Sequence, residues 1–110
     1  MLKRENRLSR ELFSLTFKQG RRVNKRYINS VYMLNNDFKS VVVVGKKISK
    51  KAVQRNLLRR RVYALIKDLK QNSSKTGYFI FLIKPDVVKL TRKNFNEFIK
   101  ADVKEILDFK

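Results

Sequence analysis

The sequence predicts an α/β sandwich of the α+β type, in which three helices cover one mostly antiparallel sheet of about four strands. Residues 53–69 and 95–106 repeat apolar side chains at steps of three and four, as helices with one buried side do. Residues 41–44 and 79–83 are instead apolar at consecutive positions, which is typical of buried strands. A chain of 110 residues that is 43% hydrophobic can bury one modest core. We therefore expect a single domain over residues 1–110, with the element order α-β-β-β-α-β-α.

The first helix is predicted between Ser9 and Gly20. Ser9 can cap it, Glu11 lies near its positive end, and Gly20 is a typical C-terminal stop. Three leucines lie on one side of this helix, at positions 8, 12 and 15. Phe13 and Phe17 lie about 140° further around the axis. The two rings can therefore either fill a wide buried face or line a second, accessible surface.

Two strands are predicted next, over residues 27–34 and 40–45. Asn35-Asn36-Asp37 between them is a turn signal. Because the two strands are so close in sequence, we expect them to pair as an antiparallel hairpin. The basic connection before them leaves room for one further short strand within residues 20–26.

A long helix is predicted from Lys51 to Lys70, with Leu58, Val62, Leu65 and Leu69 as its buried stripe. A loop at residues 72–77 separates it from a strand over residues 78–83, which is apolar at every position and ends before a proline. A last helix is expected from Thr91 to Lys110. Its buried stripe consists of Phe95, Ile99, Val103 and Ile106.

The stretch 46–61 carries eight basic side chains and no acidic one. On a helix Arg55, Asn56, Arg59 and Arg60 share an arc of about 140°, which we expect on a different side from the apolar stripe. Guanidinium groups held at fixed separation match the oxygens of phosphates, so this face predicts a polyanionic partner. The alternative is a solvated face that only keeps the protein soluble, but like charges without acidic neighbours repel one another.

The composition points to the same partner. The chain has 28 Lys and Arg against 9 Asp and Glu, a net charge of +19, which favours nucleic acid first and an anionic membrane surface second. The apolar strands favour a folded RNA or DNA binder with no membrane partner. The start of the chain lacks the apolar run of a secretory signal, so we expect a cytoplasmic protein.

The sequence contains few of the residue types that a catalytic site needs. It has no cysteine and no histidine, which excludes disulfides, thiolate zinc sites and the commonest general base. Most carboxylates are isolated, and the acidic residues of the last helix are interleaved with lysines, as on a solvated face. We predict no catalytic residue and no metal site on the protein.

The order Lys46-Lys47, Ala52, Arg55-Asn56 and Arg59-Arg60 resembles the signature of the protein subunit of bacterial ribonuclease P. Supporting matches flank this pattern at Asn6–Leu8, at Phe13, Phe17 and Gly20, and at the strand 78–83 that precedes Lys84. The resemblance implies a left-handed crossover through the long helix between two parallel neighbouring strands, against the general rule of handedness. This sequence departs from the family pattern at Arg61, where an apolar residue is usual, and at Tyr63, where a basic one is common.

The resemblance also implies a function. The RNA subunit of ribonuclease P removes the 5′ leader of precursor tRNA with bound Mg²⁺, and the protein binds both that RNA and the leader, without an obligatory protein partner. The protein is thus one subunit of a ribonucleoprotein endoribonuclease and is inactive alone. The RNA-binding residues that the resemblance implies are Lys46, Lys47, Arg55, Asn56, Arg59 and Arg60. To these we add Lys50 and Lys51, which belong to the same basic stretch. The implied leader cleft contains Phe13 and Phe17 on the first helix, with Tyr32 on its floor.

Three other classes of protein stay open on these residues. A ribosomal-type structural RNA-binding protein would show no preference for a leader. A stand-alone nuclease would cleave RNA without an RNA partner, and a DNA architectural protein would prefer duplex DNA.

Overall fold

The computed structural model describes residues 7–71 and 75–108. Asn6, loop residues 72–74 and the expected helix end at Lys110 lie outside this range. The elements in chain order are α1 (Arg10–Gln19), β1 (Arg21–Asn24), β2 (Ile28–Met33), β3 (Phe38–Val43), α2 (Ala52–Gln71), β4 (Gly77–Ile83), the 3-10 helix η2 (Pro85–Lys89) and α3 (Arg92–Asp108). The predicted order of helices and strands is confirmed, and the short strand β1 forms where the sequence left room for one.

The four strands form one sheet in the order β1-β2-β4-β3. β1 and β4 each pair antiparallel with β2, whereas β3 and β4 are parallel. The predicted hairpin between the second and third strands is therefore wrong, because β4 lies between them. β4 is apolar along its whole length, and a central position covers both of its faces, which leaves β3 at the edge.

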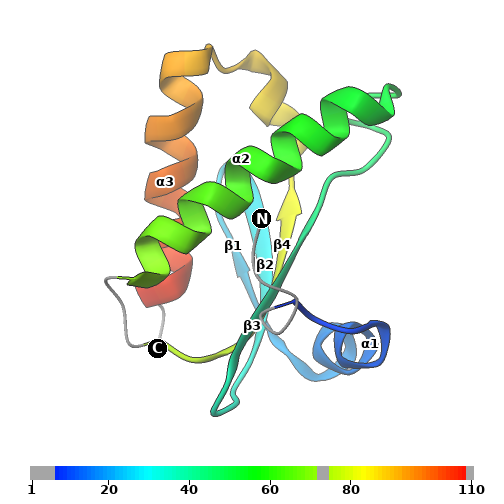
Figure 1. Ribbon diagram of the computed structural model, residues 1–110, viewed down its shortest axis with the longest axis vertical. Coiled ribbons are helices and arrows are strands. Elements are labelled where there is room, and N and C mark those ends of the chain that lie inside the picture. The colour runs from blue at the N-terminus through cyan, green and yellow to red at the C-terminus, as the bar shows by residue number, and fades with distance from the viewer. Residues whose placement is uncertain (1–6, 72–74, 109–110) are drawn as a thin grey trace.

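The long helix α2 connects β3 to β4, two parallel strands that lie side by side. In Figure 1 this helix crosses one face of the sheet diagonally, and α3 stands beside it. Two parallel neighbouring strands joined through the long helix agree with the topology that the resemblance implies.

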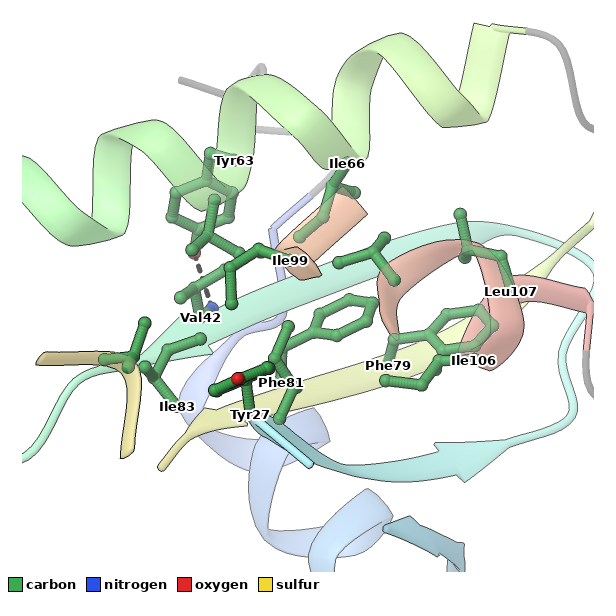
Figure 2. Close-up of a cluster of buried hydrophobic side chains, with 14 of the residues drawn as sticks. Tyr27, Val42, Tyr63, Ile66, Phe79, Phe81, Ile83, Ile99, Ile106 and Leu107 are labelled. Carbon is green, nitrogen blue, oxygen red and sulfur yellow. Dashed lines mark hydrogen bonds between the residues drawn. The ribbon is translucent and has the colours of Figure 1, made fainter. Parts of the chain in front are cut away.

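The main core lies between the sheet and the two long helices (Figure 2). Val62, Tyr63 and Ile66 are the buried residues of α2, while the other three members of its predicted stripe are partly buried against the same core. The predicted stripe of α3 is confirmed, since all four of its residues are buried. Thr91 caps α3 as expected, because its Oγ1 accepts the backbone N–H of Asn94 at 3.2 Å.

The helix α1 packs against β2 and β4 on the opposite face of the sheet. Ser9 caps it as predicted, since its Oγ accepts the backbone N–H of Leu12 at 3.2 Å. Thr16 is fully buried in this contact. Gly20 is required by close approach, because a Cβ there would lie 2.6 Å from Cγ1 of Val31 and 2.5 Å from the carbonyl oxygen of Thr16.

Candidate nucleic-acid interface

The basic face, defined as Lys46, Lys47, Lys50, Lys51, Arg55, Asn56, Arg59 and Arg60, occupies the loop after β3 and the first turns of α2. Its four lysines are exposed, as are Asn56 and Arg60, whereas Arg55 and Arg59 are half-buried. The structure therefore brings all eight predicted RNA-binding residues to one end of the molecule.

Arg59 does not lie on a separate side of α2 from the core. It precedes Val62 by three residues, Tyr63 by four and Ile66 by seven, and these spacings place all four on one stripe. Arg55 lies one turn earlier on the same stripe. Figure 1 shows the reason, because the N-terminal turns of α2 project past the end of the sheet. The stripe is apolar where it covers the sheet and basic where it leaves the sheet, which corrects our expectation for these two arginines.

Hydrogen bonds hold these two guanidinium groups. Nη1 of Arg59 donates to Oδ1 of Asn56 at 2.6 Å, and Nη1 of Arg55 donates to the carbonyl oxygen of Ser49 at 2.9 Å. Ser49 also organises the start of the helix, since its Oγ accepts the backbone N–H of Lys51 at 3.2 Å. A guanidinium has five N–H donors, so each arginine keeps donors for phosphate oxygens in a restrained geometry.

Tyr63 lies beneath this arrangement. Together with Asn56, Arg59 and Arg60 it lines a hollow of about 240 Å³ at the surface of α2. Its ring is buried, and its hydroxyl accepts the backbone N–H of Val42 on the edge strand β3 at 3.0 Å. Tyr63 thus connects the residues of this part of the basic face to the edge of the sheet.

Phe13 and Phe17 stack on each other on α1, with ring centroids 6.0 Å apart and planes 11° apart. Phe13 is half-buried, and Phe17 is 40% exposed. The guanidinium of Arg22 on β1 lies 4.8 Å from the centroid of the Phe17 ring. These residues form an accessible aromatic surface beside a cation, as the resemblance implies for a cleft. Leu15, on the leucine side of the same helix, is also 40% exposed.

Tyr32 lies on the wrong side of the sheet for this cleft. Only 8% of it is exposed, and its ring stacks on Phe79 in the main core at a centroid distance of 4.7 Å. Strand side chains alternate between faces, so its neighbours on β2 point toward α1 instead. The assignment of Tyr32 to the cleft floor is contradicted. The aromatic residue on the α1 face is Tyr78, which pairs with Met33 and which sequence reasoning missed because it depends on the register of β4.

The model of the protein family Ribonuclease P matches residues 2–107, nearly the whole chain.

This chain belongs to the ribonuclease P protein family.

The chain is 36% identical over 77 residues to the Ribonuclease P protein component of Phytoplasma australiense, an alignment that covers 64% of this chain and 66%, just under two thirds, of that protein. The fold is similar to that of a Staphylococcus aureus RNase P protein mutant with defective mRNA degradation activity, with a TM-score of 0.77 and 21% identity over 93% of this chain and 87% of the other. It is also similar to the RNase P protein of Thermotoga maritima in complex with 1-(4-fluorophenyl)-2-thiourea, with a TM-score of 0.68 and 22% identity over 84% of this chain and 91% of the other. At these identities the two structures establish the fold.

Two carboxylates of this ribonuclease P family member tie α3 to the turn between β1 and β2. Oδ2 of Asp102 accepts the backbone N–H of Tyr27 at 2.9 Å, and Glu105 forms an ion pair with Lys25 at 2.9 Å. Partial burial raises the pKa of Asp102 above its ordinary value of 3.8, although the hydrogen bond from Tyr27 opposes this. The interpretation of the acidic residues of this helix as a solvated face is therefore wrong for Asp102. Glu105 is solvated, with 60% of its side chain exposed, but its ion pair is with Lys25 and not with a lysine of its own helix.

Within residues 7–71 and 75–108, no three acidic side chains gather where they could hold a metal ion. In that same part of this family member, no helix is both long enough and apolar enough to cross a membrane.

Proposed function

We propose that this chain is the protein component of ribonuclease P. It binds the catalytic RNA through the basic face and the 5′ leader of precursor tRNA through the α1 surface, and it thereby assists removal of the leader in the cytoplasm. Membership of the family is the observation that carries this proposal. The eight residues of the basic face support it, because the structure gathers them at one end of the molecule.

The basic face acts through electrostatics. A net charge of +19 attracts RNA phosphates and releases the cations condensed on them. The arginines at positions 55 and 59 are held by hydrogen bonds before RNA arrives, so they lose less side-chain entropy on binding than free side chains would. Cations placed between RNA segments screen their mutual repulsion. The protein therefore contributes most where two RNA strands must come close, as catalytic RNA and precursor do.

The α1 surface is suited to an unpaired strand. An exposed phenylalanine ring offers a stacking partner to any base, and the adjacent guanidinium of Arg22 can reach the phosphate of the same nucleotide. Stacking of this kind tolerates many base sequences. That tolerance fits a leader, which varies from one precursor tRNA to another.

We assign the hydrolytic chemistry and its Mg²⁺ to the RNA subunit. A metal-dependent nuclease needs converging carboxylates. Asp102 and Glu105, which come near each other on α3, are engaged with Tyr27 and Lys25. The chain also has no histidine to serve as a general base. The role of the protein in this endoribonuclease is to bind and position RNA.

Cleavage of a 5′-labelled precursor tRNA at low magnesium tests this proposal. A bacterial ribonuclease P RNA is incubated with the labelled precursor, with and without this protein, beside a reaction with protein alone. We expect cleavage at the mature 5′ end only when RNA and protein are both present. Tight RNA binding without stimulation would favour a structural RNA-binding protein instead. Cleavage by protein alone would contradict the assignment of the chemistry to RNA.

A further inference from the structure

A second hollow, of about 260 Å³, lies on the other side of α2 from Tyr63, where α2, η2 and the start of α3 meet. It is lined by the apolar residues Ile48, Leu57, Leu58, Val87, Val88, Leu90 and Phe95 and by the polar residues Ser49, Gln54, Arg61 and Arg92. Val87 and Phe95 are buried and form its floor, whereas Leu57 and Val88 are 47% and 60% exposed. Two large apolar side chains thus stand at a surface that the main core leaves uncovered.

The charged side chains that line this hollow are both positive. They are Arg61 and Arg92, and none of its lining residues is acidic. The guanidinium of Arg61 lies 5.8 Å from the centroid of the Phe95 ring, so this cation stands directly over the aromatic part of the floor. An apolar hollow with two arginines favours a ligand that is planar or apolar in one part and anionic in another.

The hollow is continuous with the basic face. Ser49, which accepts the hydrogen bond of Arg55, also lines the hollow, and its Oγ lies 2.6 Å from Oε1 of Gln54, another lining residue. Arg61 directly follows Arg60 on α2. An RNA strand whose phosphates contact the basic face can therefore extend directly into the hollow.

We propose that this hollow binds one unpaired nucleotide of the RNA that the basic face holds. This proposal rests on the proposed function. The base packs between Leu57, Val88 and the floor, and Arg61 and Arg92 reach its flanking phosphates. Pockets for drug-sized ligands are roughly 300–1,000 Å³, so this smaller hollow suits a single base better than a helix of a protein partner. The charge of both arginines also suits a phosphate backbone.

Val88→Asp tests the proposal, because it places a carboxylate at the mouth of the hollow on an exposed position. Leu34→Asp is the matched control, since Leu34 is an exposed leucine at the end of β2 and the change in net charge is the same. Binding of each full-length variant to a bacterial ribonuclease P RNA is measured at one salt concentration. We expect Val88→Asp to bind about tenfold more weakly than Leu34→Asp, within the range of one base-stacking contact. Equal affinities would overturn the proposal and leave an acidic protein segment as the better occupant.

Photo-crosslinking supplies the second readout. The chain has no cysteine, so Val88→Cys creates a unique thiol for an arylazide, and Leu34→Cys is its control. We expect the label at position 88 to react with one or two unpaired nucleotides that the label at position 34 does not reach. Reaction spread over helical regions, or no reaction while the RNA is bound, would overturn the proposal. Failure of the proposed function itself is distinguishable, because wild-type protein would then not stimulate precursor cleavage.

Discussion

The hydroxyl of Tyr63 on α2 accepts the backbone N–H of Val42 on β3 at 3.0 Å. β3 is an edge strand, and an unpaired edge can recruit another chain. This hydrogen bond gives one backbone N–H of that edge an acceptor and links α2 to the sheet. Arg59 lies one turn before Tyr63, so the same contact sets the position of the basic face.

Tyr63→Phe should destabilise the protein by about 1–3 kcal/mol, because the buried N–H of Val42 loses its acceptor while the ring still fills its space. Urea unfolding measures the loss. Tyr78→Phe is the control, since Tyr78 is equally large and lies on the other face of the sheet. An unchanged midpoint for Tyr63→Phe would show that this hydrogen bond contributes nothing to the fold.

Arg60→Ala should weaken binding to ribonuclease P RNA by about 1–2 kcal/mol, the scale of one charge-assisted contact, and should lower the slope of log affinity against log salt by about 1. Arg60 is exposed, so circular dichroism should show an intact fold. Lys104→Ala removes one exposed charge from α3, away from the basic face, and serves as control. If both variants bound equally, net charge and not position would determine affinity.

Phe17→Ala should weaken binding of precursor tRNA by about 1–3 kcal/mol and leave binding of mature tRNA unchanged, because only the precursor has an unpaired leader to stack on the ring. Leu15→Ala is a closely matched control, since Leu15 is on the same helix and is also 40% exposed. Affinities of both tRNA forms for the holoenzyme are compared. An equal loss for the two forms would argue against a leader contact at Phe17.

The affinity of the protein for ribonuclease P RNA should fall by roughly 10³-fold between 50 and 200 mM salt if the basic face neutralises about six phosphates. Filter binding across this range measures it. A complex that is insensitive to salt would contradict a mode of binding in which counterions are released.

Asp102→Asn should become more stable relative to wild type as the pH rises. The folded-state pKa of Asp102 is raised, so its contribution to stability is fully present below 3.8 and is lost as the pH rises through the folded-state pKa. Asparagine keeps an oxygen that can accept the N–H of Tyr27 but cannot ionise. Thermal unfolding of both proteins between pH 3.5 and 7 tests this sign. A difference in melting temperature that did not change with pH would show that Asp102 does not titrate differently on folding.

The sequence was sufficient for elements with a local signature. The caps at Ser9 and Thr91 and the buried stripe of α3 depend on residues within a few positions of one another, and all were confirmed. The pairing of β2 with β4 was not predictable in this way, because it joins strands about 50 residues apart, and turn signals favour the nearer partner.

The predictions for the candidate site also succeeded where they depend on local sequence and failed where they depend on long-range structure. The signature residues on α2 gather as predicted, because one helix and its preceding loop carry them all. The error at Tyr32 arose because its face depends on a register that a single-residue shift inverts. The position of Arg59 on the core stripe depends on where the sheet ends beneath α2, which no local pattern specifies. Contact of these residues with RNA stays a prediction.

The place of β4 in the middle of the sheet has a consequence for synthesis on the ribosome. β1, β2 and β3 leave the exit tunnel before β4, yet neither β2 nor β3 has its inner partner until residues 77–83 have been translated. The sheet therefore closes late, after the whole of the basic stretch has already emerged. A nascent chain of this protein presents its cations to surrounding RNA before it has a finished core, so folding and first encounter with RNA can take place together.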